Sequence, residues 1–583
     1  MRELRTILPY LKPYRGIFGL GLLLVVVSNF FNTLGPRFLQ RGLDALGGDP
    51  AVVRMQALLL IGVALVGGVA RYGMRQLLNS GSREVETDIR DRLYRHVQGM
   101  TAEFYDRFPT GDVMARTTND LLAVRMVAGP ALMYLTDTVI RALLIIPAMA
   151  HISARLTLLA LLPLLGLPVA MVWLGQLIHR RSEAIQAQFS TLTSQVHEHL
   201  SGLRIVRAYR QERAEVAHFT RLSHEYLERN LALARVQGAF YPLLSLLGGL
   251  GGVIVLYVGG RQVLAGQVSA GSFVAFSVYL AMLVWPMIAL GWALNLVQRG
   301  AASMGRINAL FAERPAVVSP PHPHSLPSAA GGRAVTFEGV WFRFPNAHER
   351  GWVLQDLSFH IAAGASLAIV GPTGSGKSTL VELLIRTYDP DRGRILIDGV
   401  DIRTLSLTDL RRAVGYVPQE TFLFSETVRE NVLLGAPDDG RLERVAEVAQ
   451  LTEALPALPN GYDTLLGERG INLSGGQKQR TAIARALAQD PPIFVLDDAL
   501  SAVDAHTEAR ILAGLRGALA GRTSLIVSHR LVAVRGADEL LVLERGAIVE
   551  RGSHADLIAS GGRYWELLRR QQLEEELEHA TEA

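Results

Sequence analysis

The chain has 583 residues, more than one compact domain usually holds, so we expect at least two domains. Its 58 lysine and arginine residues nearly balance its 54 aspartate and glutamate residues, and the net charge of +4 is too small to indicate nucleic acid as a partner. The sequence contains no cysteine, which excludes disulfides, cysteine-based zinc sites and thiol catalysis.

The N-terminal segment, residues 1–15, is basic and amphipathic. No apolar stretch with a small-residue cleavage site follows it, so we predict that there is no cleavable signal peptide. The favoured interpretation is an interfacial helix that leads into a first membrane span, and an ordinary surface helix is the alternative.

Long apolar stretches follow over the first 300 residues. A membrane-spanning helix needs about 20 mostly apolar residues, and six stretches meet this requirement. The predicted spans are approximately 17–36, 55–77, 127–150, 157–177, 237–259 and 271–297.

Two long, charged segments separate these spans, at 78–126 and 178–236, and both favour helix. Both are rich in arginine, so the positive-inside rule places them, and both chain termini, in the cytoplasm. We therefore predict an integral, multi-pass protein of the inner (cytoplasmic) membrane. Each charged segment must turn at a tip, and the predicted tips are Glu103–Asp112 and His199–Glu212.

The third predicted span contains an acid and a base, Asp137 and Arg141. They are four residues apart on one helix face, so they can pair and reduce the free-energy cost of placing charge in the membrane. The pair either lines a translocation pathway or only packs the helix bundle, and the sequence leaves both possibilities open.

A segment rich in proline, serine and glycine, 313–332, marks a domain boundary. It separates a transmembrane domain, 1–312, from a soluble α/β domain, 333–562. The remaining residues, 563–583, read as a C-terminal helix or tail. The predicted fold class is therefore an α-helical, six-span transmembrane domain followed by an α/β P-loop nucleotide-binding domain.

The soluble domain contains the sequence GPTGSGKS between an apolar strand and a helix, which is the context of a phosphate-binding loop. Its glycines let backbone N–H groups surround phosphates, and the start of the helix adds its dipole. We expect Lys377 to reach the β- and γ-phosphates of ATP and Ser378 to bind Mg²⁺. The predicted nucleotide-binding residues of this loop are Gly371, Thr373, Gly374, Ser375, Gly376, Lys377, Ser378 and Thr379.

Two further apolar strands end in chemically active residues. Asp497 ends the first of them, where it would hold the metal ion, and Asp498 follows it directly. His529 ends the other strand, where it would contact the γ-phosphate. The carboxyl ends of neighbouring parallel strands meet at one sheet edge, so these residues are predicted to share one catalytic site.

The sequence LSGGQKQR resembles the signature motif of the ATP-binding-cassette (ABC) ATPases. The resemblance implies that Phe344 stacks on adenine, where the family usually has tyrosine. It also implies that Gln419 contacts Mg²⁺, acts in catalysis and couples to the membrane domain. The signature residues that would contact nucleotide are Leu473, Ser474, Gly475, Gly476 and Gln477.

The first half of the chain carries the same resemblance. The two predicted tips are similar to the coupling segments of ABC exporters, with Tyr105 and Asp106 in the first and Gly202 and Arg207 in the second. Six spans followed by one cassette imply a half-transporter of the type IV exporter fold. In this family two cassettes meet head to tail, and each ATP lies between the phosphate loop of one and the signature of the other.

One residue departs from the family pattern. Asp498 stands where the family places the glutamate that polarises the attacking water, and its carboxylate is one methylene shorter. We therefore expect a degenerate ATP site completed by a partner, in a heterodimer. The resemblance, and not the residues themselves, implies that this heterodimer exports hydrophobic compounds or peptides. Alternatives are a lipid or lipid-A flippase of the same fold, or a nucleotide-gated regulatory or channel subunit. The expected partners are a second ABC half-transporter, membrane lipids and a small hydrophobic or peptide substrate, without nucleic acid.

Overall fold

The computed structural model describes residues 3–327, 331–345 and 351–582. The chain divides into two compact units. The first consists of Met1–Gly99 and Pro109–Glu313, and the second of Met100–Phe108 and Arg314–Ala583. The short segment Met100–Phe108, which the sequence analysis assigned to the transmembrane domain, thus belongs to the second unit.

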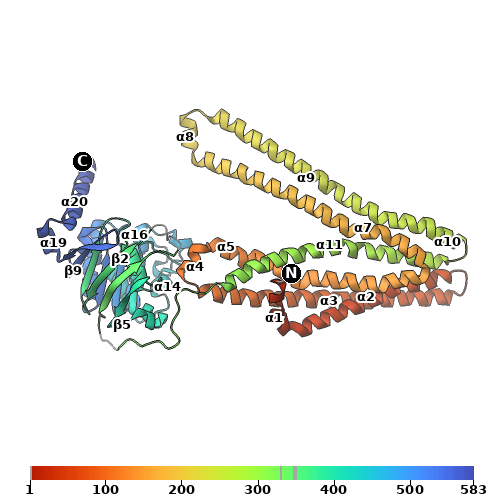
Figure 1. Cartoon of the computed structure of the whole chain (residues 1–583), viewed down its shortest axis with the longest axis horizontal. Helices are drawn as coiled ribbons and strands as arrows, with labels where there is room; N and C mark the ends of the chain where they lie inside the picture. Colours follow the sequence, from red (N-terminus) through yellow and green to blue (C-terminus); the bar gives the residue numbers. More distant parts are fainter. Residues whose placement is uncertain (1–2, 328–330, 346–350, 583) are drawn as a thin grey trace. The chain divides into compact units, whose positions relative to one another are not determined.

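The first unit is entirely helical over its described residues (Figure 1). Its elements are η1 (Glu3–Ile7), α1 (Leu8–Leu11), η2 (Lys12–Tyr14), α2 (Arg15–Asp44), α3 (Pro50–Gln98), α5 (Thr110–Ala115), η3 (Arg116–Asp120), α6 (Leu121–Met126), η4 (Val127–Ala131), α7 (Leu132–Ser201), α8 (Leu203–Ala208), α9 (Glu212–Ile254), η5 (Val255–Gly259), α10 (Gly260–Leu264) and α11 (Ala270–Ala312).

Five helical stretches of the described residues are long and apolar enough to cross a membrane. One of them, Thr110–Ser201, contains both the third and the fourth predicted spans. Ser153 interrupts it with extended backbone angles, φ −158° and ψ 110°, so the stretch consists of two helical halves that meet at a kink. The hydroxyl oxygen of Ser153 accepts a hydrogen bond from the Leu156 amide at 3.3 Å, so Ser153 caps the second half. The six predicted spans therefore correspond to five continuous elements.

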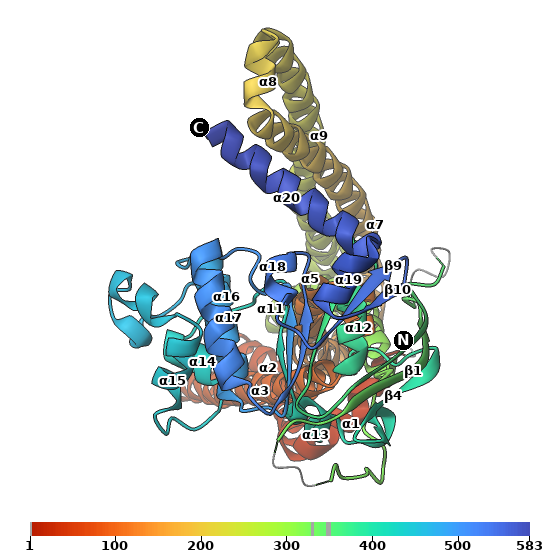
Figure 2. The ribbon, with the colours of Figure 1, turned by 90° about the vertical axis from the view of Figure 1, so that its left-hand side faces the viewer.

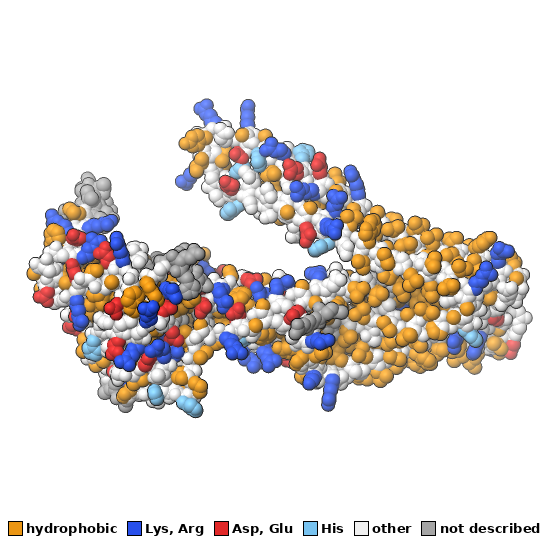
Figure 3. Space-filling view, in the orientation of Figure 1, with side chains coloured by type: hydrophobic (Ala, Val, Ile, Leu, Met, Phe, Trp, Pro, Cys, Tyr) orange, Lys and Arg blue, Asp and Glu red, His pale blue; other side chains and the backbone are white. Residues whose placement is uncertain are grey.

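The surface of the first unit matches a membrane protein. Apolar side chains cover the half of the helices that includes α10, whereas charged side chains gather toward α8 (Figure 3). Large apolar residues on α3 and α7 are strongly exposed, among them Val69 at 72% and Leu158 at 72%. Exposed apolar area on this scale is stable in contact with lipid and unfavourable in contact with water.

The second unit contains two sheets, and Figure 2 turns it toward the viewer. An antiparallel sheet has the order β2-β1-β4-β5, and a six-stranded sheet has the order β10-β9-β3-β8-β7-β6. The strands are β1 (Val335–Phe342), β2 (Leu354–Ile361), β3 (Ser366–Val370), β4 (Arg392–Ile397), β5 (Val400–Asp401), β6 (Val414–Val417), β7 (Ile493–Asp497), β8 (Thr523–Val527), β9 (Glu539–Glu544) and β10 (Ala547–Gly552).

Short helices cover these sheets, and α16 and α17 gather on one side of the six-stranded sheet (Figure 2). The helices are α4 (Ala102–Arg107), α12 (Lys377–Leu384), η7 (Ile402–Thr404), α13 (Leu407–Ala413), α14 (Val428–Leu433), α15 (Arg441–Val448), η8 (Thr452–Ala457), η9 (Gly461–Asp463), η10 (Glu468–Gly470), α16 (Gly475–Ala488), α17 (Ala505–Ala518), α18 (Leu531–Val534), α19 (His554–Ser560) and α20 (Arg563–Glu582).

The strand register determines where the functional site lies. Val527 at the end of β8 is paired with Ile369 of β3 and with Asp497 of β7. Strands β3, β7 and β8 are parallel, so their carboxyl ends reach the same edge of the sheet. The strands are continuous apolar runs because both faces are covered, and all five residues of β7 are buried.

Candidate functional site

The phosphate-binding loop follows β3 directly and leads into α12. Gly371 and Gly376 have φ of 156° and 100°, in the region that favours glycine. A Cβ atom on Gly376 would lie 2.6 Å from Leu354 Cδ2, so side-chain bulk is excluded as well. The loop therefore needs glycine at these positions in order to fold back over the start of α12.

The Lys377 ammonium group is held inside this loop. Its Nζ donates hydrogen bonds to the carbonyl oxygens of Gly371 at 2.8 Å and Pro372 at 2.9 Å. Burial lowers the pKa of Lys377, and the carboxylates of Asp498 and Asp497 act in the opposite direction. A half-buried ammonium group whose hydrogen bonds go to neutral carbonyl and hydroxyl oxygens is well suited to an anionic phosphate.

Asp497, at the end of β7, faces the loop. Its Oδ1 accepts a hydrogen bond from the Ser378 hydroxyl at 3.1 Å. Burial raises the pKa of Asp497, and the neighbouring Asp498 carboxylate raises it further. Two adjacent carboxylates and a hydroxyl are hard oxygen ligands, so a divalent cation such as Mg²⁺ fits this set.

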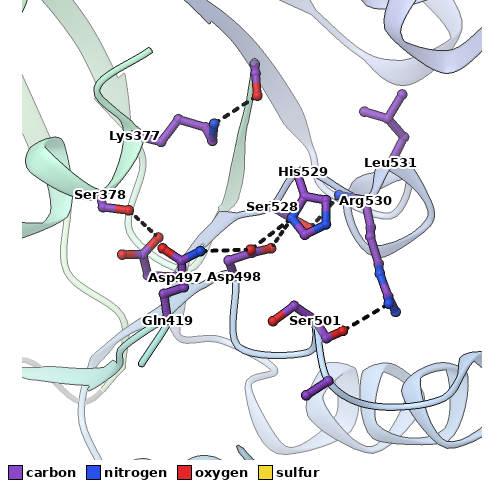
Figure 4. Close-up of polar contacts among 12 residues, drawn as sticks. Lys377, Ser378, Gln419, Asp497, Asp498, Ser501, Ser528, His529, Arg530 and Leu531 are labelled. Atoms are coloured by element: carbon purple, nitrogen blue, oxygen red, sulfur yellow. Dashed lines mark hydrogen bonds and ion pairs between the residues drawn. The ribbon is translucent and has the colours of Figure 1, made fainter. Parts of the chain in front are cut away.

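Asp498 adopts a left-handed backbone conformation, with φ of 50°. Its side chain points toward His529 (Figure 4). The Nδ1 atom of His529 lies 2.7 and 2.8 Å from the two carboxylate oxygens, and Gln419 Nε2 donates to one of them at 3.4 Å. The short carboxylate is thus held between two side chains that the sequence analysis assigned to catalysis.

A cavity of about 470 Å³ gathers most of the predicted nucleotide-binding residues. It contains residues from the phosphate loop, both aspartates and the residues assigned to base stacking and γ-phosphate contact. The predicted residues that line it are Phe344, Thr373, Gly374, Gly376, Lys377, Ser378, Thr379, Gln419, Asp497, Asp498 and His529. Gly371 and Ser375 lie behind the lining, where Ser375 is 3% exposed.

The cavity has the dimensions and polarity of a nucleotide site. The lining includes the aromatic ring of Phe344, residues of the phosphate loop and both aspartates. Among the described residues, no group of three or more His, Asp or Glu forms a separate metal site. A divalent cation would therefore use Ser378, Gln419 and Asp497 together with ligands from the nucleotide.

The signature residues Leu473–Gln477 do not line this cavity. Ser474 caps α16: its hydroxyl oxygen accepts from the Gln477 amide at 3.3 Å, and Gln477 Oε1 accepts from the Ser474 amide at 2.8 Å. The segment Ser501–Asp504 is fixed to the same helix, since Gln479 Oε1 accepts from the Ala502 amide at 2.9 Å. One chain thus presents a well-formed signature helix away from its own phosphate loop.

The first predicted coupling tip, Glu103–Asp112, is divided between the two units after Phe108, whereas the second lies in the first unit. Tyr105 and Asp106 lie on α4 in the second unit, where Asp106 accepts a hydrogen bond from Tyr388. Gly202 ends α7 and Arg207 lies on α8, both in the first unit.

The charged pair of the third span forms a closed network with a third residue. The Arg141 guanidinium lies 3.2 Å from the Asp137 carboxylate, and it also donates to Asn29 Oδ1 at 2.9 Å. Asn29 Nδ2 donates to Asp137 Oδ1 at 2.8 Å, and Asn29 is 1% exposed. The network joins α7 to α2, which supports the packing interpretation.

Sequence reasoning missed three residues of the cavity region. Val353 and Val527 line it, but single valines next to strands carry no distinguishing signal. Tyr416 hydrogen bonds to Asp497, and burial and that carboxylate raise the pKa of Tyr416. Tyr416 lies near the end of an apolar strand, three residues before Gln419. This position in the sequence could have identified it as a residue of the site.

Comparison with known proteins finds matches to both parts of the chain. Residues 18–287 match the family described as the ABC transporter transmembrane region, and residues 354–501 match the family described as ABC transporter. A solved structure described as a bacterial Atm1-family ABC exporter with ATP bound superposes with a TM-score of 0.76 at 28% identity. The match covers 94% of this chain and 98% of that chain.

Similar proteins include transporters with different names. A probable multidrug resistance ABC transporter ATP-binding/permease protein, YheI, of Bacillus subtilis (strain 168) is 38% identical, over 97% of each chain. The multidrug resistance-like ATP-binding protein MdlA of Escherichia coli (strain K12) is 37% identical, over 89% of this chain and 88% of its own. An ATP-dependent lipid A-core flippase of Nitrosococcus oceani is 33% identical, over 97% of this chain and 95% of its own.

Proposed function

The chain belongs to the ABC transporter family of ATP-driven exporters. We propose that it works as one half of a heterodimer. The heterodimer moves hydrophobic compounds or peptides from the cytoplasmic side outward. The site built on this chain's phosphate loop binds ATP and hydrolyses it slowly. The signature motif of this chain completes the competent site of the partner.

The observation that carries this proposal is the position of Asp498. Its carboxylate is held by His529 and Gln419 at the edge of the cavity. A glutamate would extend one methylene further, a difference on the order of 1 Å toward the attacking water. A misplacement of that size is enough to slow a position-dependent step about a hundredfold.

The signature helix supports the other half of the proposal. Ser474 and Gln477 form a complete capping box, so the N–H groups at the start of α16 are oriented without a ligand. Gly475 and Gly476, the first two residues of α16, have no side chains. A Cβ on Gly476 would lie 3.0 Å from the Ala502 carbonyl oxygen. This chain combines an intact signature motif with a short catalytic carboxylate. That combination is the asymmetry expected of one half of a heterodimer.

The residues of this chain have distinct roles when ATP and Mg²⁺ are bound. Phe344 stacks on the adenine, the phosphate loop and Lys377 bind the phosphates, and Ser378, Gln419 and Asp497 hold the metal ion. The metal ion neutralises charge on the phosphates when it is bound. Asp498 would orient the attacking water, and His529 holds the Asp498 carboxylate and contacts the γ-phosphate.

The sequence pattern of the chain resembles that of TmrB, one subunit of the heterodimeric exporter TmrAB, and the substrate class in this proposal rests on that resemblance. The names of the relatives YheI and MdlA refer to multidrug resistance, which supports this substrate class. We place both termini on the cytoplasmic side of the inner membrane, with α4 and α8 as the coupling segments. Asp137 and Arg141 remain candidates for the pathway lining.

A lipid flippase is the second candidate function. Two relatives that match 97% of this chain are named ATP-dependent lipid A-core flippases. A flippase would move labelled lipid between leaflets, with ATPase activity that lipid stimulates. A nucleotide-gated channel, the third possibility, would pass ions downhill without hydrolysing one ATP per ion.

The test of the degenerate site is the substitution Asp498→Glu in the purified heterodimer in lipid nanodiscs. We expect ATP turnover to rise, or at least not to fall, because the longer side chain restores the reach of the carboxylate. Asp498→Asn serves as the control of equal size without charge, and it should change turnover by less than about twofold if the site contributes little. Full exporter rates from this chain alone, or loss of turnover in Asp498→Asn, would overturn the proposal.

A further inference from the structure

The helix α4 packs as an integral part of the nucleotide-binding unit. The chain enters this unit at Met100 and leaves it at Phe108. Phe104 is only 3% exposed, and Ala102 packs against the hydrophobic core that also contains β1, β3 and α12. In the sequence α4 lies between α3 and α5, which both belong to the first unit.

A buried tyrosine makes the polar contact to α4. The Tyr388 hydroxyl donates a hydrogen bond to Asp106 Oδ2 at 3.0 Å, and Tyr388 is 8% exposed. Burial, together with the Asp106 carboxylate, raises the pKa of Tyr388, so its hydroxyl remains a donor at all ordinary pH values. A hydrogen bond to a charged acceptor is stronger than one between two neutral groups.

The ring of the same tyrosine packs against Phe344, which lines the nucleotide cavity. The ring centroids of Phe344 and Tyr388 are 5.6 Å apart, with an interplanar angle of 87°. Phe342 completes the cluster, with its centroid 5.2 Å from Phe344 and 5.6 Å from Tyr388. Phe344 lines the cavity together with Lys377, whereas Phe342 is buried behind it.

We propose that Tyr388 is a positioning residue that transmits occupancy of the adenine end of the nucleotide site to α4. A base that stacks on Phe344 fixes the orientation of that ring. The Tyr388 ring packs edge-on against it, and close packing prevents the two rings from moving independently. The hydroxyl group then fixes Asp106, so α4 is held more firmly when nucleotide is present.

The proposal predicts a specific effect on the dynamics of α4. In the assembled transporter in nanodiscs, saturating ATP with Mg²⁺ should slow amide hydrogen exchange of residues 102–107 by at least fivefold. The substitution Tyr388→Phe keeps the ring contacts with Phe344 and removes only the hydroxyl. This variant should bind ATP with a Kd within about twofold of the wild type and lose most of the protection of α4.

A matched control lies elsewhere in the same unit. Tyr564 is also a buried tyrosine, with an exposed fraction of 0%, and its hydroxyl forms one hydrogen bond, to His554 Nδ1 at 2.7 Å. The substitution Tyr564→Phe should leave both ATP affinity and the protection of α4 unchanged. If Tyr388→Phe and Tyr564→Phe behave alike, the hydroxyl of Tyr388 is only structural and the proposal is wrong.

A double-mutant cycle tests the hydrogen bond itself. Asp106→Asn keeps an acceptor oxygen and should retain most of the protection, whereas Asp106→Ala should lose it. The combination of Tyr388→Phe with Asp106→Ala should be no worse than either single change. Additive losses would show that the two residues act separately, and would overturn the proposed link.

The inference uses the proposed nucleotide site but none of the proposals on the partner or the substrate. Hydrogen exchange requires only that nucleotide binds, so it remains informative if the transporter is a homodimer or a flippase. Conversely, wild-type α4 that shows no response to bound ATP would refute the link while leaving the export function intact.

Discussion

At the scale of single residues, hydrogen bonds within the chain orient the side chains of the nucleotide site. Lys377 is held by two loop carbonyls, Ser378 is bonded to Asp497, and Asp498 is bonded to His529. Groups that are already oriented lose little conformational entropy when nucleotide binds. The same preorganisation fixes Asp498 in a position from which its short side chain has little freedom to extend.

The signature serine has two separable roles, and a substitution can separate them. Ser474 caps α16, and the resemblance to ABC ATPases also assigns it a contact to nucleotide on the partner. Ser474→Asn should preserve the cap, because asparagine is as favourable as serine at this position, whereas Ser474→Ala should cost about 1 kcal/mol of stability. Both variants should lower ATP turnover of the heterodimer more than Asp498→Asn does.

The measurements are ATP turnover and thermal unfolding of the same preparations. Equal losses of turnover from Ser474→Asn and Asp498→Asn would contradict the assignment of a competent site to the signature of this chain. An unfolding temperature of Ser474→Asn that matches Ser474→Ala would contradict the capping role.

At the scale of elements, glycine marks close approach of helices only at some positions. Within residues 246–260, Gly251 and Gly259 lie close to side chains of neighbouring helices, whereas Gly249, Gly252 and Gly260 have open space beside them. The glycine-rich sequence predicts tight packing for all of them. Only the helix rotation, which the tertiary structure sets, decides which ones face a neighbour.

The junction between α2 and the start of α11 gives a sharp test. A Cβ atom on Gly271 would lie 2.4 Å from the Gln40 carbonyl oxygen, and the Gly271 amide donates to Asp44 Oδ1 at 2.9 Å. Gly271→Ala should therefore destabilise the protein by roughly 1–3 kcal/mol, since backbone must move to admit the methyl group.

The control is Gly249→Ala, which introduces a methyl group with no atom within 4 Å. Alanine favours helix over glycine by roughly 1 kcal/mol, so this variant should be as stable as the wild type or more stable. Thermal unfolding of both variants in nanodiscs checks the prediction. A decrease that is as large for Gly249→Ala as for Gly271→Ala would exclude the steric explanation.

At the scale of the whole molecule, the chain contains one phosphate loop and one signature that do not meet in its own cavity. A complete composite site therefore needs a second cassette. We expect this chain, purified from its native membrane, to bring with it an equal amount of a second ABC half-transporter. That partner should have glutamate after its metal-binding aspartate and an altered signature, which mass spectrometry and sequencing of the copurified chain will establish.

The contrary outcome is equally clear. A purified assembly that contains two copies of this chain, with ATP turnover at full exporter rates, would exclude the heterodimer and the slow site together.

Sequence patterns alone predicted the family, the order of the membrane domain and the cassette, and nearly all of the residues that line the cavity. Those features depend on local patterns. The length of the apolar stretches indicates the spans, and the spacing of glycines together with the residues at strand ends indicates the nucleotide site. The prediction of a helical transmembrane domain followed by an α/β cassette is confirmed.

Contacts between segments that are distant in the sequence could be seen in the tertiary structure alone. It placed Met100–Phe108 in the second unit, joined Asp137 and Arg141 to Asn29, and brought Tyr388 between Phe344 and Asp106. These contacts join residues that are more than forty and up to 282 positions apart, so no local pattern encodes them. They arise when helices and sheets pack in three dimensions, where the free energy of many burial contacts fixes positions that the sequence leaves open.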